Sequence, residues 1–358
     1  MSDAPPASAE LGFCLVTGGA GYLGRHLVEE LLRRGHRVRA FDCKPLSLTH
    51  AQLETLVGDV CDFGAVRKAC QGIATVFHTA AVLDFRRFPG REGWKRSRAV
   101  NVTGVEHVIR ACREAGVRRL VHTSTNNVTL ERPVIAGDET WPYAQHPKDP
   151  YTATKIEGER RVLEANGADG LLTCAIRPGG IYGPGEALMF PRVAAECARG
   201  RFNVIIGDGA AMSDNTYIEN LVDGQIEAAR HLAADFPVCG QAYFITDGAP
   251  INYFEFFRPY VTDFGLPFPT LHLRAGLLVA AIWLWEGLGR VLGLPAPPIT
   301  VLELRKLAVS HYSGIAKARR DFGWTPKVSP EEATRRCLPY VRELYASVER
   351  VERPHWAW

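Results

Sequence analysis

Tyr151 and Lys155 are the residues whose types and spacing most directly indicate chemistry. They lie in DPYTATKIEGE, residues 149–159, where a separation of four places both side chains on one face of a helix. A phenol with an ordinary pKa of about 10 is a poor base at neutral pH. A neighbouring ammonium stabilises the phenolate and lowers that pKa. The pair therefore predicts proton removal by Tyr151 with Lys155 as its electrostatic partner.

The surrounding residues decide what this pair means, because the chain has eleven tyrosines and the spacing alone is weak evidence. VHTSTNN, residues 121–127, ends a predicted strand with Ser124 and Thr125. A loop that contains proline then leads to Tyr151. The carboxyl ends of parallel strands meet at one edge of a sheet, where cofactors bind. We therefore expect a hydroxyl from this strand to fix a substrate oxygen beside the phenol.

A glycine-rich loop indicates what else binds at that edge. In TGGAGYLG, residues 17–24, Gly18, Gly21 and Gly24 follow a predicted strand and open a predicted helix, with Tyr22 and Leu23 at the helix start. Gly18 permits a tight turn, Gly21 lets backbone N–H groups approach a pyrophosphate, and Gly24 lets helix and strand pack closely. The helix N-terminus adds positive potential. The loop predicts a dinucleotide site.

Further residues favour NAD as that dinucleotide. Asp42 ends the next predicted strand, 18 residues past Gly24. A carboxylate there accepts both ribose hydroxyls and repels a 2′-phosphate, which favours NAD over NADP. Lys44 and Arg25 lie close in sequence and weaken that preference. The other expected cofactor contacts are Asp59 and Val60 in GDV, and Ala80 and Ala81 in HTAA. No metal site is expected.

The elements that must position these residues alternate between strand and helix. Strands are predicted at 13–17, 37–42, 55–58, 75–79, 119–124 and 171–177, and helices at 22–34, 63–71, 102–115 and 151–166. Apolar strands that are each followed by an amphipathic helix predict an α/β fold, a doubly wound parallel sheet of the Rossmann type. After RPGGIYGPG, residues 177–185, helices dominate, with proline-rich joints at 267–269 and 295–298.

The predicted domain organisation follows from this change of pattern. We expect a disordered tail at 1–11 and an NAD-binding Rossmann domain at 12–186, to which 213–248 returns. A smaller, mostly helical substrate-binding cap is expected at 187–212 and 249–345, and a second tail at 346–358.

Composition limits the partners and the compartment. A net charge of +3 over 358 residues, with scattered basic residues, gives no reason to expect nucleic acid. Nine cysteines without a C-x-x-C pair are typical of reduced thiols in a cytoplasmic protein, and neither a disulfide framework nor a zinc site is expected. The polar, proline- and alanine-rich start lacks the layout of a signal peptide.

One apolar segment, residues 275–294, leaves two readings open. Its unbroken apolar stretch covers about 11 residues, well short of the roughly 20 that a spanning helix needs. It is either a buried or lid helix, or a helix that lies on a membrane surface. In both readings the segment supplies apolar area in the half of the chain that is expected to form the substrate pocket. That area fits an apolar ligand.

Taken together, the motifs TGGAGYLG, GDV, HTAA, NVTG, YTATK and RPGGIYGPG resemble those of the extended short-chain dehydrogenase/reductase family. The resemblance narrows to its 3β-hydroxysteroid dehydrogenase/isomerase group, including bacterial members. That narrowing depends on VHTSTNNV, LLTCAIRPGGIYGPGE, SDNTYIENLVDG, GQAYFITDGAPINYFEFFRPY and SGIAKARRDFGWTP.

The resemblance implies roles for the residues that match the family's motifs. Tyr151 is the general base, and Lys155 is its partner and a ribose contact. Thr125 stands where the family usually has serine; its hydroxyl can serve, but its methyl group restricts χ1. Ser124 is the adjacent substitute.

Other carried-over positions hold the site together. Asn101 helps to hold helix geometry, and Pro178 with Gly179 lines the nicotinamide end. Tyr217 and Asn220 lie in a motif that returns to the sheet, where a structural role is the alternative reading.

The activity implied by the resemblance is NAD-dependent oxidation of a steroid or sterol 3β-hydroxyl to the 3-ketone, with Δ5-to-Δ4 isomerisation. The isomerase base is not located, and Asp84 is only one candidate. Alternatives are a decarboxylating 4-carboxysterol 3-dehydrogenase, a nucleotide-sugar epimerase or reductase, and a cofactor-bound binding protein without catalysis. Membrane contact through 275–294 and a homodimer are both allowed.

Overall fold

The structure is a computed structural model that describes residues 10–86, 89–292, 297 and 299–348. Most of both predicted tails, most of the predicted joint at 295–298, and the last two residues of the 275–294 segment lie outside the described residues.

The centre of the molecule is a seven-stranded parallel sheet with the order β12-β7-β5-β4-β1-β2-β3. The chain runs from β1 outward to β3 and then crosses back to β4, so the strand order reverses beside β1. This confirms the predicted doubly wound sheet, with β12 as a strand that was not predicted. The strands are β1 (Cys14–Thr17), β2 (Val38–Asp42), β3 (Leu53–Val57), β4 (Thr75–His78), β5 (Arg119–Thr123), β7 (Leu172–Pro178) and β12 (Gln241–Ile245).

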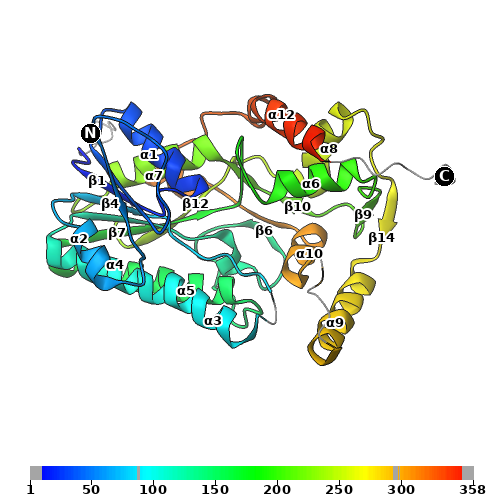
Figure 1. The fold of residues 1–358 in the computed structure, drawn as a ribbon, viewed down its shortest axis with the longest axis horizontal. Helices are drawn as coiled ribbons and strands as arrows, with labels where there is room; N and C mark the ends of the chain where they lie inside the picture. Colours follow the sequence, from blue (N-terminus) through cyan, green and yellow to red (C-terminus); the bar gives the residue numbers. More distant parts are fainter. Residues whose placement is uncertain (1–9, 87–88, 293–296, 298, 349–358) are drawn as a thin grey trace.

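Helices cover both faces of this sheet (Figure 1). On one face lie α1 (Tyr22–Arg33) and α7 (Ile218–Arg230); on the other lie α2 (Phe63–Ala69), α4 (Gly104–Ala115) and α5 (Pro150–Glu164). Successive strand residues point to opposite faces. Leu15 of β1 therefore packs in the core under α2 and α4, whereas Val16 packs in the core under α1 and α7.

The helix before β5 is longer than predicted and contains one π-helical turn. It runs through α3 (Gly90–Arg98), the π turn at Ala99–Thr103, and α4. Such turns are rare in proteins, and those that occur are often found at functional sites. This turn carries Asn101. The Asn101 side-chain oxygen accepts from the Val82 N–H, and its NH₂ group donates to the Val82 carbonyl and to the Thr154 hydroxyl. Helix α5 packs tightly here, because a Cβ on Gly158 would lie 2.6 Å from the Asn101 carbonyl oxygen.

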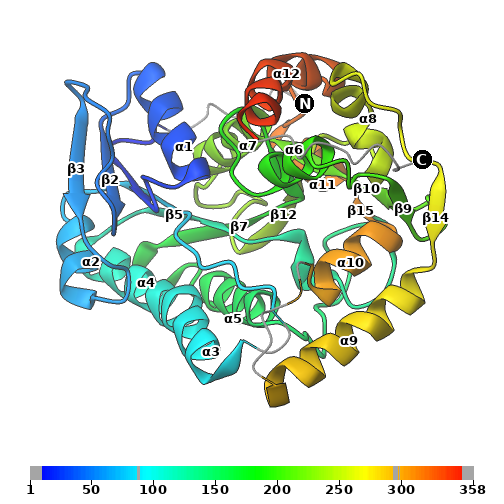
Figure 2. The same cartoon turned by 45° about the vertical axis from the view of Figure 1, so that its right-hand side comes forward.

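The rest of the chain is helical with short strands, as expected for the C-terminal part, and within it β12 joins the main sheet beside β7, with α7 packed on that sheet (Figure 2). Its helices are α6 (Met189–Ala198), α8 (Tyr253–Asp263), α9 (Ala275–Leu292), α10 (Val301–Ala308), α11 (Ala316–Phe322) and α12 (Pro330–Ser347). One small sheet holds β13 (Ile251–Asn252), β10 (Met212–Ser213), β15 (His311–Ser313) and β6 (Val134–Gly137). Two pairs complete the strands: β8 (Gly180–Tyr182) with β11 (Asn215–Tyr217), and β9 (Val204–Ile206) with β14 (Leu271–Leu273). Short 3₁₀ turns lie at Asn126–Thr129 and Ala168–Gly170.

Helix α9 has a small apolar core of its own. Ile282 packs with Val301 and Leu304 of α10, separately from the cores on the two faces of the main sheet. In both views α9 lies at the outer edge of the molecule, with α10 beside it (Figures 1 and 2).

A fully buried carboxylate fastens α5 to the sheet. Glu159 accepts hydrogen bonds from Arg177 of β7 at 2.6 Å, from the Tyr143 hydroxyl at 2.7 Å, and from the Ser124 hydroxyl. Both charged groups are almost completely removed from water. Removing one partner of such a pair leaves an uncompensated charge in the interior.

We expect Glu159→Ala to lower the free energy of unfolding by about 3–5 kcal/mol, because Arg177 would remain buried without its counter-ion. The matched control is Glu157→Ala on the same helix, whose ion pairs with Arg98 and Arg161 are partly exposed. It should cost about 1 kcal/mol or less. Chemical denaturation measures both, and equal losses would contradict the role given to Glu159. Adding Arg177→Met to Glu159→Ala should recover part of the loss.

Candidate active site

The glycine loop has a backbone that side chains would block. Gly18 adopts φ +72°, and a Cβ on Gly24 would lie 2.0 Å from the Gly18 carbonyl oxygen. No side chain caps α1 at Gly21, so the first N–H groups of the helix face outward with their partial positive charge. This geometry fits a pyrophosphate. Leu23 is buried in the core, and the ring of Tyr22 packs edge-on against His26.

The Asp42 carboxylate lies directly beside this loop. One oxygen accepts from the Ala20 backbone N–H at 3.1 Å, and the other accepts from the Lys44 backbone N–H at 3.0 Å. The acidic group therefore stands at the end of β2, next to the loop, where a ribose held by the loop would need it. Its placement fits NAD.

The remaining residues expected near the adenine and the pyrophosphate lie around the same strand ends. The exposed Asp59 carboxylate accepts from the Cys61 backbone N–H at 2.9 Å. Val60 is buried and packs against Gly104 at the start of α4. Ala80 approaches the loop so closely that a Cβ on Gly18 would lie 2.8 Å from its nitrogen, and Ala81 follows it. Small residues are required on both sides of this contact.

Tyr151 and Thr125 come together from α5 and from the end of β5. Both side chains are buried, and the Thr125 side chain lies close enough to the phenol for hydrogen bonding to lower the phenol's pKa. Burial raises the pKa of Tyr151 to about 12, the hydrogen bond from Thr125 opposes that rise, and the Asp149 carboxylate adds to it. The Phe85 ring packs nearly perpendicular to the phenol ring, with 5.0 Å between centroids.

Lys155 lies one helical turn from Tyr151 with its head group against β5. Its Nζ donates to the Thr123 carbonyl oxygen at 2.5 Å and lies 3.3 Å from His122 Nε2. Burial lowers the pKa of Lys155 to about 8, and the Glu159 carboxylate opposes that shift. From the sequence we expect the ammonium to lower the pKa of Tyr151. The structure instead has a raised pKa, because burial of the phenol outweighs the other influences.

Ser124 and Thr125 are adjacent but have different partners. Ser124 donates its hydroxyl to the buried Glu159 carboxylate, away from Tyr151. The Thr125 hydroxyl accepts from the Asn127 backbone N–H at 3.2 Å and lies near enough to Tyr151 to lower the pKa of the phenol. Of the two candidate hydroxyls, the structure thus places that of Thr125 beside the phenol.

The residues expected to line the nicotinamide end of the cofactor site lie at the carboxyl end of β7. Pro178 ends the strand, and Gly179 follows so tightly against β11 that a Cβ would lie 2.1 Å from the Asp214 carbonyl oxygen. Tyr217 and Asn220 both donate to Asp247, Tyr217 through its backbone N–H and Asn220 through its side chain. Their contacts in the structure hold α7 in place.

The Asp84 carboxylate is committed to an ion pair. Both of its oxygens accept from Arg86, at 2.8 and 2.6 Å, and these hydrogen bonds lower the pKa of Asp84. Its backbone oxygen accepts from the Tyr151 N–H at 3.1 Å. A carboxylate with a lowered pKa is a weak base.

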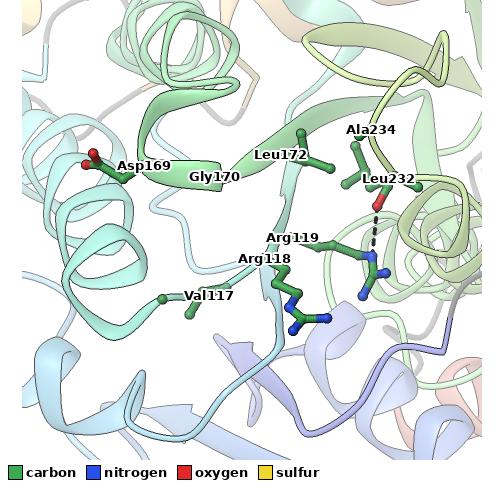
Figure 3. A pocket seen from close by; sticks show the side chains of 10 residues that line it. Val117, Arg118, Arg119, Asp169, Gly170, Leu172, Leu232 and Ala234 are labelled. Atoms are coloured by element: carbon green, nitrogen blue, oxygen red, sulfur yellow. Dashed lines mark hydrogen bonds between the residues drawn. The ribbon is translucent and has the colours of Figure 1, made fainter.

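A surface pocket of about 440 Å³ lies at the opposite edge of the sheet (Figure 3). It is formed where β5 and β7 begin, and Arg119 donates there to the Leu232 carbonyl oxygen at 2.8 Å. Tyr151 and the glycine loop lie at the carboxyl ends of the strands, so this pocket is separate from them.

His78 and His122 are residues near the site to which the sequence assigned no role. Both are buried, on β4 and β5, and their rings stack with centroids 5.3 Å apart. They stand within HTAA and VHTSTNN, so an attentive reading could have selected them. The contact between His122 and Lys155, however, depends on where α5 crosses the sheet.

The sheet order, the glycine loop and the Tyr151–Lys155 helix define an extended short-chain dehydrogenase/reductase. Within that class, the chain belongs to the 3-beta hydroxysteroid dehydrogenase/isomerase family, whose model matches residues 15–274. The predicted family is therefore confirmed.

Full-length relatives carry two kinds of name. A protein of Mycobacterium tuberculosis named 3 beta-hydroxysteroid dehydrogenase/Delta 5-->4-isomerase is 43% identical over 99% of this chain and 96% of its own length. A mouse protein named sterol-4-alpha-carboxylate 3-dehydrogenase, decarboxylating, is 36% identical over 92% of this chain and 91% of its own. Among solved structures, MoeE5 in complex with UDP-glucose and NAD shares the fold, with a TM-score of 0.71 and 24% identity over 93% of this chain and 99% of its own.

We expect Gly24→Ala to destabilise the protein by about 1–3 kcal/mol or more, and to weaken NAD binding by at least tenfold. The new methyl group would meet the Gly18 carbonyl and force α1 away from β1. Thermal unfolding and calorimetric titration with NAD measure the two effects. Gly287→Ala in α9 is the control, because nothing lies within 4 Å of its added Cβ. If both variants bind NAD like the parent, the loop does not hold the cofactor.

Proposed function

We propose that this protein oxidises the 3β-hydroxyl of a steroid or sterol to the 3-ketone with NAD as hydride acceptor, and that it moves the Δ5 double bond to Δ4. The observation that carries the proposal is that Tyr151 and Thr125 lie together at the edge of the sheet that also carries the glycine loop, in a chain 43% identical to a relative named for both steps. The sheet residues 12–186 and 213–248 bind NAD, and 187–212 and 249–345 form the substrate-binding cap.

Each residue of the site has a definite task in the oxidation. Thr125 and Tyr151 hold the substrate oxygen, and Tyr151 in its phenolate form takes the hydroxyl proton as the carbon–hydrogen bond breaks. NAD, when bound, accepts the hydride at C4 of its nicotinamide. Lys155 supplies positive charge near the phenol and a contact to the ribose. Ser124 supports the site through Glu159 rather than through the substrate.

The cofactor contacts follow the same edge of the sheet. The backbone of Gly18, Gly21, Tyr22, Leu23 and Gly24 would hold the pyrophosphate, and Asp42 would accept hydrogen bonds from the ribose hydroxyls. The adenine and nicotinamide ends are bounded by small or buried residues: Asp59, Val60, Ala80, Ala81, Pro178 and Gly179. Asn101 keeps the π-helical turn fixed against α5.

The isomerisation step needs a base for the C4 proton of the ketone. The bidentate pair with Arg86 makes Asp84 a poor choice, because its pKa is lowered and its lone pairs are occupied. We assign no residue to this step.

A second candidate activity is NAD-dependent oxidation of a 4-carboxysterol with loss of CO₂. The mouse relative, 36% identical over most of both chains, favours it. The same Tyr151 chemistry would serve, and only the product differs. A nucleotide-sugar substrate fits less well, because α9 places apolar rather than basic surface in the cap. A binding protein without catalysis has no use for the buried phenol and lysine.

Among the described residues, no helix is long and apolar enough to cross a bilayer. We infer that α9 instead rests on the surface of a membrane, from which a sterol can enter the cap, and that the protein is otherwise cytoplasmic. The side chains of Leu277, Leu284 and Leu288 are 71%, 64% and 44% exposed, and Trp283 and Trp285 are also exposed. Apolar side chains with tryptophan are typical of interfacial helices. A homodimer through the same face is the competing use of this surface.

Tyr151→Phe should lower kcat for a 3β-hydroxy-Δ5-steroid by about 10²–10⁴-fold, because the substrate proton would lose its acceptor. Its Kd for NAD should stay close to that of the parent protein. Absorbance of reduced nicotinamide gives the rate, and calorimetry gives the Kd. Loss of NAD binding would make Tyr151 a structural residue.

Product analysis with the parent protein separates the activities. A conjugated enone supports the first proposal, and release of CO₂ from a 4-carboxysterol supports the second. Activity on a sugar nucleotide alone would overturn both.

Leu284→Glu in α9 should reduce binding to phosphatidylcholine vesicles by at least tenfold, because a buried leucine contributes roughly 1.5–3 kcal/mol. Val57→Glu is the control, since that exposed apolar residue lies on β3, far along the chain from α9. Co-sedimentation measures the bound fraction. Equal binding by both variants contradicts the membrane proposal, and a change in oligomeric state with Leu284→Glu alone points to the homodimer.

A further inference from the structure

A row of polar side chains crosses the sheet beneath α5. Thr17 of β1 pairs in register with His78 of β4, and His78 pairs in register with His122 of β5. Register partners in a parallel sheet share a face. Thr17 Oγ1 lies 2.6 Å from His78 Nδ1, the two imidazole rings are stacked, and the row ends at Lys155 Nζ.

The contact with Lys155 fixes the state of the His122 ring. A lysine ammonium can only donate hydrogen bonds, so Nε2 of His122, 3.3 Å away, must be the nitrogen with the free lone pair. The ring proton is then on Nδ1. Burial keeps the ring uncharged, because it lowers the pKa of His122 well below its ordinary value, and the charge of Lys155 lowers it further.

Two ring nitrogens of this row have no partner among the described protein groups. In the part of the chain that the structure describes, His122 Nδ1 and His78 Nε2 are both buried without a hydrogen-bond partner. The two rings are joined by stacking alone. The described protein groups therefore link His122 to Lys155 by a hydrogen bond and to His78 by ring stacking.

Several groups face the Lys155 head group. They are His122 on β5, His78 on β4, and Glu159 on α5, which is itself paired with Arg177 of β7. Burial lowers the pKa of His78 to about 3, so both imidazoles are neutral near pH 7. Glu159 is the acidic group that favours the ammonium, but its oxygens are bonded to Arg177, Tyr143 and Ser124. Lys155 donates its direct hydrogen bonds to groups of β5, the Thr123 carbonyl and His122 Nε2.

We propose that His122 is a positioning residue for Lys155. Its neutral ring and the Thr123 carbonyl each accept one hydrogen bond from the ammonium, and the third N–H is left to donate to Tyr151 or the cofactor ribose. His78 holds the His122 ring by stacking. The consequence for catalysis rests on the proposed function, whereas the contact itself does not.

The first test reads the ring directly in the protein without substrate. In protein labelled with ¹⁵N-histidine, the His122 signals, identified by their loss in His122→Gln, should be those of the neutral Nδ1–H form throughout pH 5–9. The Nε2 shift should have an inflection near pH 8, where Lys155 loses its proton. Lys155→Met should remove that inflection. An Nε2–H form, or titration near pH 6.5 as for a free imidazole, would overturn the proposal.

The second test uses the pH profile of dehydrogenation. His122→Phe keeps the stacked ring but removes the acceptor, so the charged form of Lys155 loses stability and its pKa falls. Catalysis needs that charge. The pH at which kcat/KM begins to fall on the alkaline side should therefore be lower by roughly one pH unit, and at pH values above this point kcat/KM should be about tenfold below that of the parent protein. His122→Gln restores an acceptor, so the alkaline fall of kcat/KM should lie closer to the pH seen in the parent protein. His78→Phe should leave it unchanged.

The outcomes separate the two proposals. An alkaline fall of kcat/KM at an unchanged pH in His122→Phe, with normal folding, would overturn the positioning role. If the parent protein oxidises no sterol while the NMR inflection is present, the contact stands and the proposed function fails.

Discussion

The approach of α1 to the end of β1 is the constraint on which the rest of the site depends. A Cβ at Gly24 would lie 2.0 Å from the Gly18 carbonyl oxygen, so the helix can reach this position only without a side chain there. The approach directs the helix N-terminus and its free N–H groups toward the strand ends. It also brings the Ala20 backbone within reach of Asp42. The proposed cofactor site is thus a result of backbone packing more than of particular side chains.

The second support is the face of α5 that carries Tyr151, Lys155 and Glu159 at intervals of four residues. Glu159 binds the helix to the sheet through Arg177, and Lys155 binds it through the Thr123 carbonyl. At the N-terminal end, Asp149 caps the helix by accepting from Thr152 N–H at 2.8 Å. These bonds leave Tyr151 little freedom to rotate with the helix. Stability and the position of the phenol therefore depend on the same contacts.

Much of the fold and of the loop chemistry could be predicted from sequence, because it is encoded locally. Strand and helix periodicity located six of the seven strands of the main sheet within two residues at their starts, and the glycine spacing located the turn. The partners of Ser124 and Thr125 could not be predicted, since they depend on which way each residue faces at the end of β5. The raised pKa of Tyr151 was also missed, because burial is a property of the folded molecule. The role of His122 could not be predicted either, because its contact with Lys155 depends on how α5 packs across the sheet.

The separate apolar core of α9 and α10 has a consequence for motion. Ile282, Val301 and Leu304 form a cluster apart from the cores that hold the main sheet together. A segment with so little shared packing opens at a lower free-energy cost than the whole molecule does, as a cooperative unit of its own. Amide protons of this helical hairpin should therefore exchange with deuterated solvent long before those of β1 or β5. A bulky ligand could be admitted and released by such excursions while the nucleotide half stays rigid.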